Sequence, residues 1–270
     1  MTVNNLSLAG LRPDIASAIR DASAQTGIDA EFLTRQAGVE SNFNPHAKAA
    51  TSSATGLYQF IDQTWLETVR KHGNEHGLGW AADRIERTPG GRYSAGNAEA
   101  DILALRTQPA AAAAMAAAFA ADNRDHLESQ LGREVDSTDL YMAHFLGAAG
   151  AAAFLKAKDE QPNQPAANIL PAAARANRSV FFAASGTPRS LSEIHQRFAR
   201  KFDERGTAAM PTRMASASAP KTAEADALSS TRRWIAARAN GTADISAQQI
   251  TPTTARLLYL SLTSTGSEAI

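Results

Sequence analysis

The sequence predicts a mainly α protein, and two observations lead to that prediction. Alanine-rich stretches with helical spacing of apolar residues dominate the chain, and the alternating pattern of a half-buried strand is scarce. A chain of 270 residues can bury a sizeable core, so we expect one main domain with a smaller appendage.

Composition argues against several classes of function. The 27 lysine and arginine residues balance the 27 aspartate and glutamate residues, so the net charge favours neither a nucleic-acid partner nor binding to an acidic membrane surface. Cysteine is absent, which removes disulfides, zinc-thiolate sites and thiol nucleophiles. We predict a globular protein without a cofactor.

Two helices are predicted near the N-terminus. The first starts near Pro13, after a polar lead, and the second has Asp29 as its N-cap. Pro45 disfavours helical geometry at Asn44, so the second helix should end within a few residues of Glu40. Its rough apolar stripe consists of Phe32, Leu33, Ala37 and Val39.

Glu40 is thereby placed at the C-terminal end of a helix, where the partial negative charge disfavours an ionised carboxylate. Apolar neighbours such as Val39 and Phe43 remove water and also favour the neutral carboxyl. Cleavage of an acetal needs a protonated acid, because the leaving sugar oxygen must receive a proton. The alternative is that Glu40 is a solvated surface residue followed by a turn.

Three motifs extend this interpretation beyond one glutamate. The first two are Glu40-Ser41-Asn42-Phe43-Asn44-Pro45 and Gly56-Leu57-Tyr58-Gln59-Phe60, with Thr64-Trp65 beyond them. In this order they resemble the lytic transglycosylases of the soluble-lytic-transglycosylase (SLT) type, which are relatives of goose-type lysozyme. A weaker third motif, residues 141–150, resembles a later helix of that family, with His144 and Phe145 where Tyr and Asn are common.

The resemblance implies a lysozyme-like catalytic domain that cleaves the β-1,4 bond between N-acetylmuramic acid and N-acetylglucosamine in peptidoglycan. In that family one Glu protonates the bridging oxygen, and its carboxylate then takes the proton of the muramyl C6 hydroxyl, which closes a 1,6-anhydro ring. By carry-over, Glu40 is first the acid and then the base. The same carry-over implies that Ser41 lies beside the acid and that Ser52 or Ser53 faces the acetamido groups of the sugar. It implies that Tyr58 lines the sugar site and that Gln59 is a substrate-binding amide. In the third motif, Tyr141 would orient Glu40, and His144 and Phe145 would lie on the aromatic side of the cleft.

The number of carboxylates separates two possible reactions. Two-carboxylate glycosidases need a second Asp or Glu about 5 to 9 Å from the acid. The nearest acidic residues after Glu40 are Asp62 and Glu67, and Asp62 stands at a predicted helix start, where a carboxylate is expected for capping. A single carboxylate favours ring closure. Hydrolysis on the same scaffold and a non-catalytic wall-binding or assembly protein remain the alternatives.

Three other segments contain patterns that bear on a metal site, a membrane span or a sugar cleft. The run His72-Gly73-Asn74-Glu75-His76 matches a zinc pattern by letter, but its glycine weakens the helix that would align both histidines, so no metal site is predicted. The alanine-rich run 109–121 is too short for a membrane span and is predicted as a buried helix. The irregular segment 73–94 suits either a wall of a sugar cleft or plain surface.

We expect the catalytic domain to cover residues 1–205, with a core over about 13–155 and a further helix over 166–178. A linker over 206–222 and a helical segment over 223–270 should follow, the latter offering a docking face for export or assembly machinery. Residues 1–26 lack the pattern of an ordinary secretory signal. Because peptidoglycan lies outside the cytoplasm, we expect a periplasmic or envelope protein delivered by another route, with a flagellar or type III route as the leading hypothesis.

Overall fold

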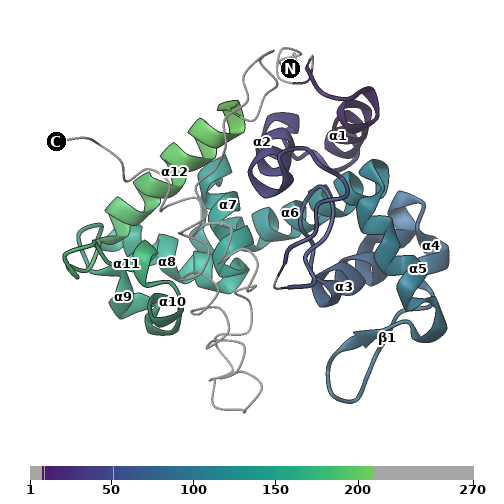
Figure 1. The fold of residues 1–270 in the computed structure, drawn as a ribbon. Helices are drawn as coiled ribbons and strands as arrows, with labels where there is room; N and C mark the ends of the chain where they lie inside the picture. Colours follow the sequence, from purple (N-terminus) through teal and green to yellow (C-terminus); the bar gives the residue numbers. More distant parts are fainter. Residues whose placement is uncertain (1–7, 9, 51, 209–270) are drawn as a thin grey trace. The chain divides into compact units, whose positions relative to one another are not determined.

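The computed structural model describes Leu8, residues 10–50 and residues 52–208, without the side chains of 204–208. These described residues form twelve α-helices and one two-stranded sheet, so the predicted mainly α class is confirmed (Figure 1). They divide into two compact units. The first holds the described residues up to Asp122 and from Asp203 onward, and the second holds Asn123–Phe202.

The first unit combines helices with one small hairpin. Its α-helices and strands are α1 (Pro13–Thr26), α2 (Ala30–Ser41), α3 (Asp62–His72), α4 (Gly79–Ala82), β1 (Glu86–Arg87), β2 (Tyr93–Ser94), α5 (Glu99–Ala104) and α6 (Pro109–Leu131), which continues into the second unit. Three short 3-10 helices join them: η1 (Gly73–His76), η2 (Gly96–Ala98) and η3 (Leu105–Thr107). Trp65 of α3 is fully buried and donates its indole N–H to the carbonyl of Ile102 at 2.8 Å, which ties α3 to α5.

The two helices before the candidate acid start where the sequence predicts. Pro13 is the first residue of α1, where its missing N–H has no partner to lose. Asp29 caps α2 by accepting the backbone N–H of Glu31 at 2.8 Å. Residues on nearly every side of α2 are buried, although Val39 of the predicted stripe is only partly so.

A β-hairpin is held against the start of α3. β1 and β2 pair antiparallel, with Arg87 opposite Tyr93. The side-chain amide of Gln63 donates to the Tyr93 carbonyl at 2.9 Å and accepts the Tyr93 N–H at 2.8 Å. The segment 73–94, predicted as irregular, therefore contains short ordered elements, because side-chain hydrogen bonds can stabilise turns in a glycine-rich stretch.

The alanine-rich run forms α6, and most of its alanines from Ala111 to Ala120 are buried, as predicted. The helix continues to Leu131, ten residues past the expected end. No single helix of the described residues combines the length and apolar character of a membrane span. The pair Gly96–Thr107 and Pro109–Leu131, bent by 91°, meets both criteria only when its parts are joined.

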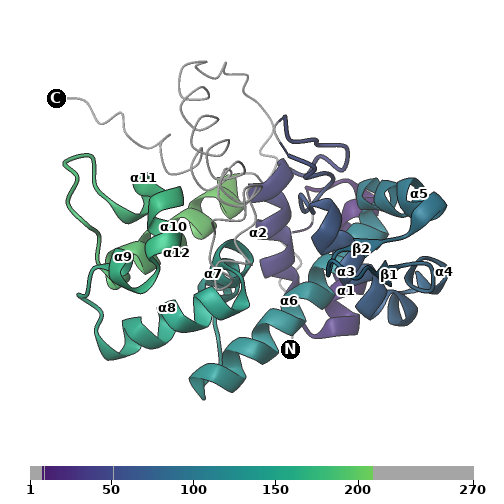
Figure 2. The same ribbon diagram turned by 90° about the horizontal axis from the view of Figure 1, so that it is seen from below.

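The second unit is entirely helical in its described part. It contains part of α6 and then α7 (Ser137–Leu146), α8 (Ala148–Glu160), α9 (Ala166–Ile169), α10 (Pro171–Ala176), α11 (Arg178–Phe181) and α12 (Leu191–Ala208) as far as Phe202. The short helices α9, α10 and α11 lie beside α12 in both views (Figures 1 and 2). An aromatic cluster joins α7 to α12, with ring centroids 4.8 Å apart for Tyr141 and Phe202 and 5.2 Å for Phe145 and Phe198.

The prediction of one continuous helix over 166–178 is wrong, because the segment is divided into short helices. Pro171 has no N–H to continue a helix and restricts Leu170, so the chain forms α9 and then starts α10 at Pro171 itself. A second break follows at Asn177, whose buried side chain donates to the Ala173 carbonyl at 3.1 Å. The predicted helical segment over 223–270, and the linker beyond the end of α12 at Ala208, lie outside the described residues.

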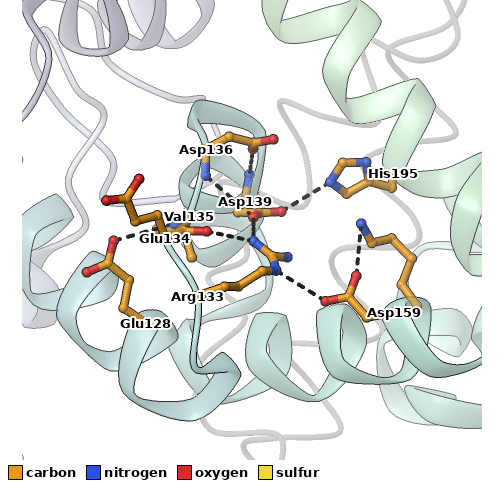
Figure 3. Close-up of polar contacts among 9 residues, drawn as sticks. Glu128, Arg133, Glu134, Val135, Asp136, Asp139, Asp159 and His195 are labelled. Atoms are coloured by element: carbon orange, nitrogen blue, oxygen red, sulfur yellow. Dashed lines mark hydrogen bonds and ion pairs between the residues drawn. The ribbon is translucent and has the colours of Figure 1, made fainter.

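A buried carboxylate organises the start of α7 (Figure 3). Asp139 is 1% exposed; its carboxylate accepts from Arg133 Nη1 at 2.8 Å and lies 3.1 Å from His195 Nε2 of α12. Asp136 completes a capping box by accepting the Asp139 N–H at 2.8 Å. Burial acts to raise the pKa of Asp139, but the hydrogen bonds and charges of His195 and Arg133 outweigh it and hold the pKa below its ordinary value.

We expect Asp139→Asn to lower the free energy of unfolding by about 2–3 kcal/mol at pH 7, because it leaves Arg133 and His195 facing a neutral amide. The depressed pKa means that the ionised carboxylate stabilises the fold above pH 3.8, its ordinary value, and that this stability is lost as pH falls through the folded-state pKa. Urea unfolding at pH 7 and pH 3 measures both effects.

The matched control is Asp159→Asn, which removes the other carboxylate that pairs with Arg133, at 3.2 Å, from a side chain 44% exposed. Its expected cost is below about 1 kcal/mol. Equal losses for the two variants at pH 7 would contradict the role assigned to Asp139.

Candidate active site

Glu40 lies at the second-last position of α2 and is 5% exposed. Among the residues that the structure describes, only Glu40 and Asp139 are buried carboxylates, and Asp139 belongs to the ion network of the second unit. The alternative that Glu40 is a solvated surface residue is therefore wrong. The sequence places a carboxyl at a helix end, and the fold encloses it.

The chain reverses directly after Glu40. Asn42 and Phe43 have φ values of 51° and 60°, and their N–H groups return to the carbonyls of Gly38 at 3.0 Å and Ala37 at 3.3 Å. Asn tolerates this left-handed conformation, whereas a residue such as Phe adopts it rarely, at a cost of about 1–2 kcal/mol. Backbone strain of this kind clusters at functional sites, and here it lies three residues from Glu40.

A loop then returns to the end of α2. The hydroxyl of Ser41 donates to the Leu57 carbonyl at 2.8 Å, with the Ala37 carbonyl at 3.1 Å as its alternative acceptor. The residue next to the candidate acid is thus bonded to the second motif across sixteen positions of sequence. This contact gives Ser41 a direct role in joining the two motifs.

Gln59 holds the same loop from inside. It is 8% exposed, and its amide nitrogen donates to the Ala47 carbonyl at 3.2 Å and to the Gly56 carbonyl at 2.9 Å. Its own φ is 50°, which makes Gln59 the third non-glycine residue with a left-handed backbone among the described residues, after Asn42 and Phe43. The amide of Gln59 therefore has a structural role, and its substrate-binding role stays a prediction.

Arg106 of η3 fastens both ends of the loop, and sequence reasoning missed it. Its Nη1 donates to the carbonyls of Ser53 at 2.8 Å and Phe60 at 2.9 Å, and it pairs with Asp62 at 2.8 Å. Arg106 is 7% exposed, and burial lowers its pKa below the ordinary value although Asp62 acts in the opposite direction. The available signal was a lone charge directly after the apolar run 102–105, a position that suits a buried, paired side chain.

Gly56 marks where the backbones of the loop and η3 meet. Its φ is +86°, and a Cβ placed there would lie 1.9 Å from the Arg106 carbonyl oxygen. Only glycine fits this close approach. The Gly56-Leu57 pair of the second motif is thus required by packing within the unit.

The comparison with known families bears directly on this loop and helix. Residues 17–79 match the family model of the Transglycosylase SLT domain. This SLT segment contains Glu40, the reversal after it, the loop from Ser52 to Phe60 and all of α3. The match confirms the resemblance in the first two motifs, agrees with the mainly α, lysozyme-like class, and supports a peptidoglycan-acting function of the lytic transglycosylase type.

Within the SLT segment, the remaining predicted residues differ in exposure. Ser52 is half-buried and accepts the Ala54 N–H at 3.3 Å, while exposed Ser53 accepts the Asp62 N–H at 3.2 Å. Tyr58 is 1% exposed, which strongly raises its pKa, and its hydroxyl has no hydrogen-bond partner among the described residues. The structure places Tyr58 in the core, and its role in lining the sugar site stays a prediction.

Three predicted residues lie outside the SLT segment, in the second unit. Tyr141 and Phe145 are both fully buried in the aromatic cluster with α12. The ring of Phe145 packs against Phe198, and its place on the aromatic side of a cleft stays a prediction. His144 is half-buried and stacks on Tyr141 with ring centroids 6.4 Å apart. The roles of Tyr141 and His144 toward substrate stay predictions.

The zinc-like run in the SLT segment does not assemble a ligand set. α3 ends at His72, which lies 2.8 Å from Asp122, whereas His76 follows in η1 and lies 2.8 Å from Gln25. In the second unit, ligand atoms of Asp136, Asp139 and His195 lie within 4.8 Å of one another. Hydrogen bonds within that group and to Arg133 already account for the arrangement (Figure 3).

We expect Gln59→Ala to destabilise the protein by about 1–3 kcal/mol, because the buried Gly56 carbonyl and the half-buried Ala47 carbonyl lose their donor. The same change should weaken cleavage, since the loop joined to Ser41 is loosened. Thermal unfolding and digestion of purified sacculi measure the two effects. The isosteric Gln59→Glu has no amide donor and should lose at least as much stability; a Glu variant as stable as wild type would contradict the donor role.

Proposed function

We propose that this protein is a lytic transglycosylase that cleaves the β-1,4 bond between N-acetylmuramic acid and N-acetylglucosamine and leaves a 1,6-anhydro end. The observation that supports it best is Glu40, a buried carboxyl at the end of α2, joined through Ser41 to the Gly56–Phe60 loop inside the SLT segment. Burial and the helix end are the surroundings that a general acid needs.

In the proposed reaction, the Glu40 carboxyl gives its proton to the bridging oxygen as the bond from that oxygen to the muramyl C1 breaks. The resulting carboxylate then takes the proton of the muramyl C6 hydroxyl, and the C6 oxygen forms its bond to C1. Glu40 gives one proton and takes one proton back, so the reaction requires neither a water molecule nor a second carboxylate of the enzyme.

The first two acidic residues that follow Glu40 in the sequence support ring closure over the two-carboxylate route. Asp62 is paired with Arg106 at 2.8 Å, and Glu67 is exposed on α3, 3.3 Å from the Tyr93 hydroxyl. An ion-paired Asp62 and a solvent-exposed Glu67 are poor candidates for the second group of a retaining or inverting glycosidase. Asp62 has a structural partner instead, as its place at the start of α3 suggested.

The test is digestion of purified peptidoglycan sacculi, with the masses of the released muropeptides as the readout. Ring closure adds no water to the product, whereas hydrolysis adds one. We expect anhydro-muropeptides from wild-type protein. Products that each carry an added water would favour the hydrolase alternative, and the absence of any product from folded protein would favour a wall-binding or assembly role.

The proposed substrate places the protein in the periplasm or cell envelope, where peptidoglycan lies. Neither a cofactor nor a metal is part of the proposed reaction. The export route, and a docking role for residues 223–270, stay predictions from the sequence.

A further inference from the structure

The end of the second unit carries an unusual charge balance. Residues 161–202 contain one acidic residue, Glu193, and six basic residues, which are Arg175, Arg178, Arg189, Arg197, Arg200 and Lys201. The whole chain is neutral, and Asp159, Glu160, Asp203 and Glu204 flank this stretch directly, so the excess is confined to it. Arg178 and Arg200 are exposed, and Arg189 and Arg197 are half-buried.

Four of these side chains gather around α11 and α12; we name them the arginine surface, formed by Arg178, Arg189, Arg197 and Arg200. On α12, Glu193, Arg197 and Arg200 share one face through their spacing of four and three residues. Arg189 lies two residues before that helix. The neighbouring charges of Arg189 and Arg200 act on Arg197, after burial, to lower its pKa, which agrees with their closeness.

The two arginines near α11 are held in place by uncharged groups. Arg189 Nη1 donates to the carbonyls of Ser179 at 2.7 Å and Val180 at 3.1 Å, and also to that of Phe182. The guanidinium of Arg178 stacks 4.8 Å above the ring of Phe182. Uncharged groups therefore hold both side chains, while Glu193 is an acidic residue whose charge acts on Arg189 and Arg197.

Counter-charges are scarce on this surface. Within the described residues none of the four arginines forms an ion pair, and the Nε of Arg197 is buried without a hydrogen-bond partner. Residues 209–270 hold more basic than acidic residues, so their charge does not complement the surface either. Guanidinium groups that are held in place and form no ion pair are suited to binding an external carboxylate, because Arg can bind a carboxylate with two parallel hydrogen bonds.

We propose that the arginine surface binds the carboxylates of the peptide stems of peptidoglycan. This inference rests on the proposed function, because that function names the anionic polymer that the protein meets. A sacculus presents many stems on neighbouring strands, so this contact can hold the protein on the wall without taking part in bond cleavage. Its affinity should fall with salt, as for any exposed charge pairing.

The experiment measures sedimentation of the protein with purified sacculi, with every variant made in a Glu40→Gln background to prevent cleavage. The test variant is Arg197→Gln with Arg200→Gln, and the control is Arg20→Gln with Lys156→Gln, two exposed cations elsewhere that remove the same net charge. We expect about five- to tenfold weaker binding for the test variant, and less than a twofold change for the control.

Sacculi stripped of stems by an amidase form the second arm, and on them the test variant should bind as its parent does. If the test variant binds intact sacculi as tightly as its parent does, the proposal is overturned and an acidic protein partner is favoured. If the test variant loses as much affinity for stripped sacculi as for intact sacculi, the proposal is also overturned. Arg200→Glu, at an exposed position, repeats the test without risk to folding. Product masses from wild-type protein are read separately, so failure of the proposed function is distinguishable.

Discussion

Glu40→Gln is expected to lower the rate of muropeptide release by about a hundredfold to ten-thousandfold or more, because it removes the transferable proton and keeps the size of the side chain. Glutamine can neither protonate the bridging oxygen nor accept the proton of the C6 hydroxyl. Both halves of the proposed reaction are therefore lost in one substitution. Release of muropeptides from purified sacculi measures the effect.

The control for this substitution is Glu67→Gln, the same chemical change at an exposed position of α3. It should retain near wild-type activity. Circular dichroism and thermal unfolding of both variants check that the fold is kept. A folded Glu40→Gln protein that still releases muropeptides would move the acid to another residue, and loss of activity in Glu67→Gln would reopen the two-carboxylate mechanism.

Gly56→Ala is expected to lower the free energy of unfolding by about 3–5 kcal/mol, the combined effect of a positive φ and a backbone clash. The added Cβ would lie 1.9 Å from the Arg106 carbonyl oxygen, and backbone cannot move aside as a flexible side chain can. The loop held by Gln59 and Ser41 would shift as a consequence. Activity should fall together with stability.

Gly77→Ala provides a matched control, because Gly77 also has a positive φ, of +73°, but nothing lies within 4 Å of an added Cβ. Its expected cost is the conformational part only, about 1–2 kcal/mol. Chemical denaturation measures the free energy of unfolding of both variants. The difference between their losses gives the cost of the backbone clash at Gly56. Equal losses at the two positions would show that the loop and η3 do not meet as closely as the structure indicates.

The parts predicted well from the sequence depend on neighbouring residues. Asp29 caps α2, Pro13 opens α1, and the helix ends next to Glu40 because the following turn cannot continue it. These signals act over a few residues, so they can be read without knowing the fold. The break at Pro171 follows the same rule, because proline has no N–H with which to continue a helix.

The parts missed depend on residues that are distant in the chain. Arg106 lies 53 positions from Ser53, and His195 lies 56 positions from Asp139. The burial of Tyr58 and Phe145 was also missed, because an aromatic side chain in a motif suits a sugar cleft and a core equally well.

By itself, the sequence determined the helical class, the SLT-type motifs and the identity of the candidate acid, since these follow from residue types at short spacing. Only the tertiary structure decided that Glu40 is enclosed, that Asp62 is occupied by Arg106, and that Gly56 tolerates no side chain. The physical reason is that burial and ion pairing depend on which distant segments pack together, and that packing is decided by the free energy of the whole fold.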